Sequence, residues 1–171
     1  HPRDRRQRQM CIRDRVLKGH IAVATSDLKQ DDIGKKIDVR ARKFLKKSNL
    51  DYAHGTGHGV GFFLNVHEGP QSISRLNDVK IKEGMILSNE PGFYKKNKFG
   101  IRIENLVYVK RLNRKLFFEN LTLAPIEKDL INFNLLTKFE KNYLFKYHLN
   151  VYSKISKYLN PNEKKWLASL I

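Results

Sequence analysis

The sequence of 171 residues has one cysteine, few acidic residues and no run of about 18 apolar residues. A single cysteine excludes a disulfide framework and a cysteine-rich zinc module. Without a long apolar run, no membrane-spanning helix and no membrane partner are expected. Residues 1–15 also lack the apolar stretch of a secretory signal peptide, so a cytoplasmic location is expected.

Basic residues dominate the composition, because 34 Lys and Arg stand against 17 Asp and Glu and give a net charge of +17. The lysines are spread along the chain, which is typical of solvated surfaces, whereas nucleic-acid sites more often gather Arg and aromatic residues on one element. No nucleic-acid partner is therefore expected, although the charge keeps that alternative open. With 40% hydrophobic residues, the chain can form a core of about one domain.

Residues 1–15 differ from the rest, since they hold six Arg and almost no apolar residues. Their second half, residues 10–15, resembles the translation of a transposon-end adapter used in DNA library preparation. We therefore interpret 1–15 as an adapter-derived segment or a disordered arm, to be kept out of fold reasoning. The single cysteine, Cys11, lies within it.

Periodicity further along predicts a helix, then a series of strands, then further helices. A helix over 31–47 is expected to begin at Asp31 or Asp32, and a helix over 138–159 follows a capping box formed by Thr137 and Glu140. A last helix starts near Pro161. Strands are expected over 66–70, 85–89, 101–109 and 117–123.

Three of the six histidines, His54, His58 and His67, fall within fourteen residues around a glycine-rich turn. The glycines do not have the spacing of a dinucleotide or phosphate loop, and no second His follows His67 at the spacing of a helical zinc protease. Such a cluster is either a functional site or a set of packed and surface side chains.

Two carboxylates follow, Glu90 after one expected strand and Glu104 inside the next, where Arg102 shares its face. On a solvated face, Arg102 and Glu104 would form a weak surface ion pair. On a buried face, the carboxylates would need a cation or a metal ion to offset desolvation.

Together these segments, HGTGHGVG, VHEGP, SNEPGFY and GIRIEN, resemble the signature segments of Xaa-Pro aminopeptidase, also called aminopeptidase P. This family belongs to the methionine aminopeptidase and prolidase superfamily. The resemblance implies an α/β (α+β) fold of the pita-bread type, with a curved, mainly antiparallel sheet covered by helices. It also implies a dinuclear metal-dependent hydrolase that releases the N-terminal residue from peptides with proline in second position.

By motif match, the resemblance implies that His58, Glu90 and Glu104 are metal ligands, with Glu104 bridging two divalent ions. Mn²⁺ is favoured, with Co²⁺ or Zn²⁺ possible for such donors. It implies that His54 and His67 line the substrate pocket, Glu90 takes a proton from the attacking water, and Arg102 orients the acids. Tyr94 matches a position next to the ligands. We expect His58 Nε2 and both carboxylates to converge within about 5 Å.

The family's two Asp ligands match no position here, so the chain is expected to be an inactive fragment of a parent enzyme that is a homodimer. Residues 16–126 would be the C-terminal part of the catalytic domain and 127–171 a helical extension. Two alternatives remain, namely a prolidase-type dipeptidase with the same chemistry and a non-catalytic pita-bread binding module.

Overall fold

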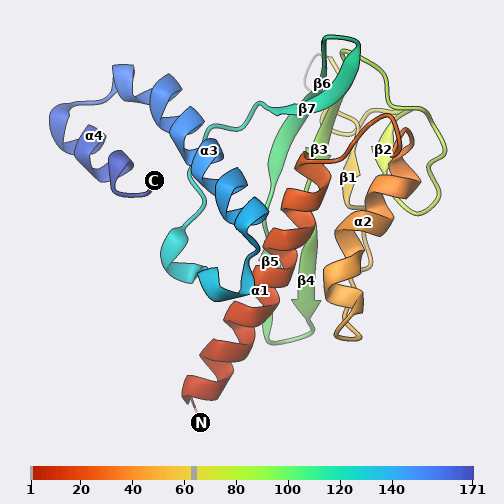
Figure 1. The fold of residues 1–171 in the computed structure, drawn as a ribbon. Coiled ribbons are helices and arrows are strands. Elements are labelled where there is room, and N and C mark those ends of the chain that lie inside the picture. The colour runs from red at the N-terminus through yellow and green to blue at the C-terminus, as the bar shows by residue number, and fades with distance from the viewer. Residues whose placement is uncertain (1, 63–64) are drawn as a thin grey trace. The chain divides into compact units, whose positions relative to one another are not determined.

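The computed structural model describes residues 2–62 and 65–171, and Figure 1 shows how its elements follow one another. Two compact units make up the chain, one formed by residues 15–122 and the other by residues 123–171 with those up to 14. The boundary expected between 126 and 127 therefore lies beyond the division in the structure. No helix of the described residues is long and apolar enough to cross a membrane.

The first helix differs from the expectation for the N-terminus. Helix α1 (Pro2–Ala24) includes most of the segment expected to be an adapter or a disordered arm, so the structure gives these residues helical rather than irregular backbone. Whether these residues derive from an adapter stays a prediction. Helix α2 (Gly34–Lys46) confirms the helix expected over 31–47, but Ile33 rather than Asp31 or Asp32 occupies its N-cap.

Seven strands belong to the 15–122 unit: β1 (Gly57–His58), β2 (Ser72–Ile73), β3 (Ile86–Asn89), β4 (Gly92–Lys95), β5 (Phe99–Arg102), β6 (Asn105–Leu112) and β7 (Lys115–Asn120). They form a β3-β6-β7 sheet and the pairs β1-β2 and β4-β5, and every one of these pairings is antiparallel. The expected mixed fold with a mainly antiparallel sheet is confirmed. Within the described residues, the strand expected over 66–70 is wrong, because that segment forms turns and loop.

The long strand expected over 101–109 is interrupted, and this break positions the carboxylates. Gly92 pairs with Arg102 in β4-β5, and Asn89 pairs with Asn105 in β3-β6. The two residues between these registers on each chain, 90–91 and 103–104, lie outside the ladders. Pro91 has no N–H to donate, which explains why regular pairing stops there. Glu90 and Glu104 therefore lie in facing breaks of one antiparallel ribbon.

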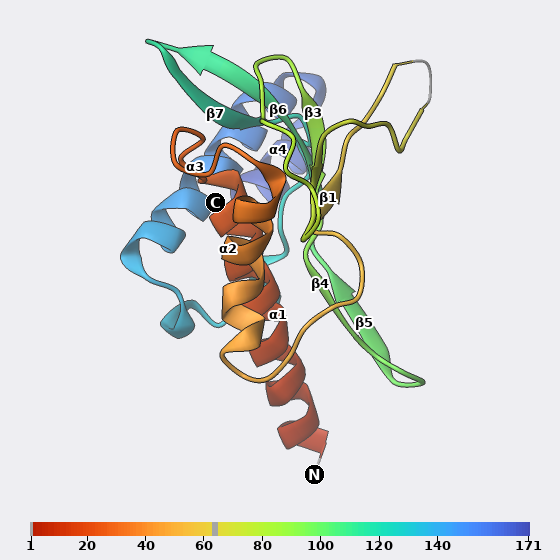
Figure 2. The same ribbon diagram turned by 90° about the vertical axis from the view of Figure 1, so that its right-hand side faces the viewer.

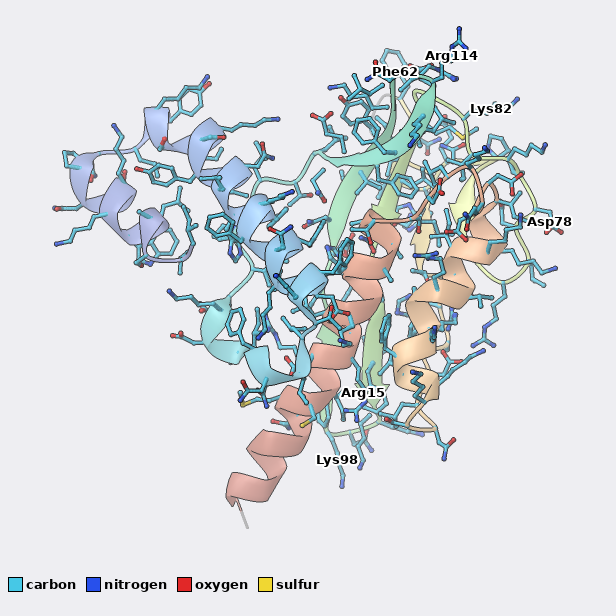
Figure 3. All side chains as sticks on the ribbon, in the orientation of Figure 1. Arg15, Phe62, Asp78, Lys82, Lys98 and Arg114 are labelled. Carbon is cyan, nitrogen blue, oxygen red and sulfur yellow. The ribbon has the colours of Figure 1, made fainter. Side chains whose placement is uncertain are left out.

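Helices α1 and α2 pack against the sheet, on the same side of β1 and β3 (Figure 2). The core joins apolar residues of both helices, of the strands and of two loops: Val23, Leu28, Ile37, Ala41, Ile73, Ile81, Leu87, Val107, Val109 and Phe118. Charged hairpin tips lie at opposite ends of this unit, with Lys98 between β4 and β5 and Arg114 between β6 and β7 (Figure 3).

The other unit is mainly helical. It contains η1 (Lys128–Leu130), η2 (Phe133–Leu135), α3 (Lys138–Ile155), η3 (Ser156–Tyr158) and α4 (Pro161–Ala168). The capping box expected at Thr137 and Glu140 is formed at α3, and Asn160 and Glu163 form another at α4. These residues satisfy backbone N–H groups that would otherwise be free at the helix starts.

Candidate active site

The short strand β1 brings His58 against the β3 strand. Its backbone N–H donates to Ser88 Oγ at 2.9 Å, and Gly59 bridges to Leu87. A Cβ atom at Gly57 would lie 1.9 Å from the Ser88 carbonyl oxygen, so only glycine permits this approach. The glycine-rich segment therefore serves close contact between strands, and it holds His58 at the edge of the ribbon break.

Glu90 lies at the centre of the polar cluster and is nearly buried. Its Oε1 accepts a hydrogen bond from Ser88 Oγ at 3.0 Å and lies 3.4 Å from His58 Nε2. Its Oε2 lies 3.1 Å from Arg102 Nη1. The backbone N–H of Glu90 donates to the Thr56 carbonyl at 2.8 Å, so backbone and side chain are both fixed.

Arg102 links the two carboxylates. The same Nη1 that approaches Glu90 lies 3.6 Å from Glu104 Oε2, and Nε donates to the Tyr94 hydroxyl at 2.8 Å. The Tyr94 hydrogen bond and the neighbouring carboxylates raise the pKa of Arg102. Because the Arg102 and Glu104 side chains are 45% and 43% exposed, this second ion pair is weak and can rearrange.

The histidine rings offer lone pairs rather than protons to the site. Nδ1 of His58 lies 3.0 Å from the Gly59 carbonyl, and Nδ1 of His54 lies 2.6 Å from the Gly55 carbonyl. A carbonyl only accepts, so Nδ1 carries the proton and Nε2 of each neutral ring is an acceptor. The Nε2 atom of His54 is buried and has no partner among the described residues. The exposed His67 ring packs 3.9 Å from that of His58, measured between centroids.

A buried charge network fixes the backbone of residues 51–61, called here the histidine loop. The guanidinium of Arg42 donates to the carbonyls of Tyr52 at 2.7 Å and His54 at 2.6 Å. It also pairs with Asp38 and Asp51, both at 2.7 Å. Burial works to raise the pKa of Asp51, but the hydrogen bonds from Arg42 and from the Tyr52 N–H, together with the positive charges of Arg42 and Arg75, lower it overall. The ring of His54 contacts Tyr94 edge-on, with 5.3 Å between centroids.

Imidazole nitrogen and carboxylate oxygen are suitable donors for a divalent ion. Two acceptors, His58 Nε2 and Glu90 Oε1, face one another at 3.4 Å, which favours a cation or a proton between them. Two donors are too few for a metal site, however. Among the described residues, no group of three or more His, Cys, Asp or Glu could hold a metal ion. In this arrangement the residues do not form a metal site, and Arg102 is the cation that neutralises both carboxylates.

The structure brings the six sequence-predicted residues into one neighbourhood of linked contacts. Arg102 pairs with Glu90 and Glu104, and His58 Nε2 lies 3.4 Å from Glu90. The ring of His67 packs on that of His58, and the ring of His54 contacts Tyr94. Their individual roles stay predictions. Sequence reasoning missed Ser88, Arg42 and Asp38. The last two had a signal, since charged residues spaced i, i+4 on the apolar stripe of an expected helix must be buried together.

Comparison with known proteins identifies a family. Residues 2–111 match the model of metallopeptidase family M24, and residues 114–170 match the C-terminal region of peptidase M24. A probable Xaa-Pro aminopeptidase P of Laccaria bicolor is 45% identical over 166 residues, covering 90% of this chain and 26% of that protein. Xaa-Pro aminopeptidase 1 of Dictyostelium discoideum is 43% identical over 178 residues, covering 96% of this chain and 28% of that protein.

A solved structure agrees. The X-prolyl aminopeptidase of Caenorhabditis elegans, described as a cytosolic enzyme with a dinuclear active site, has a TM-score of 0.83 at 39% identity. It covers 94% of this chain, which in turn covers 28% of it. The prolidase of Pyrococcus furiosus has a TM-score of 0.56 at 30% identity and covers 65% of this chain, which covers 31% of it. The chain thus spans about a quarter of the length of the curated relatives it matches.

Proposed function

The chain belongs to metallopeptidase family M24, and from that premise we propose that it supplies part of the active site of an Xaa-Pro aminopeptidase. Such an enzyme is a metal-dependent hydrolase that releases the N-terminal residue from peptides with proline in second position. The observation that carries the proposal is the cluster of His58, Glu90, Arg102 and Glu104 at the break of one antiparallel ribbon.

Glu90 is the proposed proton acceptor from the attacking water. Ser88 donates to one of its oxygens and Arg102 pairs with the other, so both oxygens are held in place beside the proposed position of the water. Arg102 is proposed to keep Glu104 next to Glu90 until further ligands join. Both tasks use contacts already present in the cluster.

His54 and His67 are proposed to line the substrate pocket. The Nε2 atom of His54 is an acceptor while its ring is neutral, so His54 donates to a substrate carbonyl or an oxyanion only as imidazolium. His67 is exposed beside His58, where a peptide can reach it. Both rings also contact aromatic neighbours, Tyr94 in the case of His54 and His58 in the case of His67.

We further propose two divalent ions as cofactors of the assembled enzyme, with Mn²⁺ favoured over Co²⁺ or Zn²⁺, and with His58, Glu90 and Glu104 among the ligands. Since these three donors do not suffice as arranged, additional carboxylates must join them. A cytoplasmic location and a homodimer are part of the same proposal. The cytosolic description of the Caenorhabditis elegans enzyme supports the location.

The test uses the longest reading frame that contains this sequence, expressed and supplied with Mn²⁺. We expect release of the N-terminal residue from a tripeptide with proline second, no release when alanine replaces that proline, and loss of turnover in Glu90→Gln. Cleavage of Xaa-Pro dipeptides alone would support a prolidase instead. A folded protein that cleaves neither peptide would support a binding module.

The 171-residue chain alone is the matched control. With Mn²⁺ it should bind no ion stoichiometrically in a calorimetric titration and should not cleave the tripeptide, because its described residues bring together only one His and two Glu. Metal-dependent turnover by this chain would contradict the view that the donor set is short of ligands.

A further inference from the structure

His20, on the C-terminal half of α1, contacts both chains of the interrupted ribbon. Its Nδ1 lies 3.2 Å from the Ile103 carbonyl oxygen, and its own backbone carbonyl accepts a hydrogen bond from Asn89 Nδ2 at 3.0 Å. Ile103 and Asn89 are the residues immediately before Glu104 and Glu90. One residue of a helix is thus bonded to the position that precedes each carboxylate.

These two bonds lie where regular pairing between the two chains of the ribbon is interrupted. Regular pairing ends at Asn89 and Asn105 on one side and resumes at Gly92 and Arg102 on the other. Between them, a long bond of 3.4 Å from the Ile103 N–H to the Pro91 carbonyl crosses the gap. Hydrogen bonds between the two chains of the ribbon therefore do little to fix the spacing of the two facing breaks.

The His20 side chain is fully buried, and Nε2 has no hydrogen-bond partner among the described residues. An unpartnered buried nitrogen costs stability, and an apolar side chain of similar size would avoid that cost. A carbonyl only accepts, so the ring must donate from Nδ1 to Ile103. Burial lowers the pKa of His20 to about 4, which keeps the ring neutral at neutral pH.

We propose that His20 is a positioning residue that sets the spacing of Glu90 and Glu104 by bonding to the residue before each of them. Its Nδ1–H fixes the chain at Ile103, and its carbonyl fixes Asn89 through the side-chain amide. A shared catalytic role of the two carboxylates rests on the proposed function. The effect of His20 on their spacing is independent of that function.

Hydrogen exchange of single amides in the 171-residue chain tests this directly. The N–H groups of Glu90 and Ile103, which lie at the break, donate to the carbonyls of Thr56 and Pro91, so their exchange rates report local opening. We expect His20→Leu to raise both rates tenfold or more. His20→Asn places an amide N–H where Nδ1 stood, so it should restore most of the protection.

Two amides elsewhere in the same unit separate a local effect from general loss of stability. The N–H groups of Ile81 and Val109 donate to carbonyls in other parts of the unit, at 2.8 Å each, and should not change in His20→Leu. Val23→Ala, a cavity in the core on the same helix, is the matched control and should raise all four rates together. A uniform rise in His20→Leu, or no rescue by His20→Asn, would overturn the proposal.

A measurement on the unsubstituted chain covers the case in which His20→Leu does not fold. Long-range proton–nitrogen correlation of the His20 ring should place the proton on Nδ1. A proton on Nε2 would leave the Ile103 carbonyl without this donor and would refute the proposal. Neither experiment uses turnover, so failure of the aminopeptidase assignment and failure of the positioning role are distinguishable.

Discussion

Replacing Arg42 tests whether the buried charge network holds the histidine loop. Its side chain is 2% exposed and donates to two carboxylates, of Asp38 and Asp51, and to two carbonyls, of Tyr52 and His54. The guanidinium carbon also lies 3.9 Å from the centre of the Tyr52 ring. Arg42 therefore ties helix α2 to the segment 51–54 that leads into His58.

In Arg42→Met, the carboxylate of Asp38 remains buried with no cation beside it. Removing one partner of a buried ion pair costs about 3–5 kcal/mol, because the remaining charge loses its compensation. Arg40→Met is the matched control on the same helix. The Arg40 side chain is 42% exposed and that of its partner Asp31, 3.0 Å away, is 13% exposed, so water screens this pair from the arginine side and it should contribute less than the fully buried pair of Arg42.

The assay is urea unfolding followed by amide resonances of α2, which report the 15–122 unit. Fluorescence of Trp166 would report the other unit, and two units need not unfold together. We expect Arg42→Met to lower the free energy of unfolding by several times more than Arg40→Met does. Equal losses, or a loss below about 1 kcal/mol for Arg42→Met, would refute the account of the network as a buried ion cluster.

Two further predictions concern His20 and Gly57. Burial lowers the pKa of His20 from 6.5 to about 4, so the unfolded chain binds the extra proton first and stability should fall as pH drops from about 6.5 to 4. The free energy of unfolding measured in urea titrations should fall by about 3 kcal/mol over this pH range. In His20→Asn this fall should be absent, and an equal fall in the variant would show that other groups cause it. Gly57→Ala would force its Cβ against the Ser88 carbonyl and should destabilise the unit by roughly 1–3 kcal/mol. Gly69 has open space around it, so Gly69→Ala is the control and should not destabilise the unit. Equal unfolding midpoints for the two variants would contradict the close approach of Gly57 to Ser88.

Local patterns were sufficient for several elements. The apolar spacing over 31–47 predicts α2, and the capping box at Thr137 predicts the start of α3, because both signals depend on neighbours a few residues away. The motifs that carry the family resemblance are equally local. The six candidate residues were therefore named from the sequence, and the structure places them in one neighbourhood.

Local patterns failed where the outcome depends on distant partners. The apolar run over 101–109 resembles one strand, yet it divides at 103–104 because Pro91 on the facing chain cannot continue the ladder. Asp31 and Asp32 suit an N-cap, but they bind Arg40 and Lys36 instead. Each of these outcomes depends on a residue whose position the local pattern does not specify.

By itself, the sequence indicated the candidate site residues, predicted α2 and the start of α3, and showed which family the motifs resemble. Only the tertiary structure decided that Glu90 and Glu104 face each other across a break, that Arg102 lies between them, and that His20 is bonded beside both. The reason is physical: helix periodicity and capping act over one or two turns. A desolvated charge or a ring nitrogen finds its partner only when segments far apart in the chain pack together.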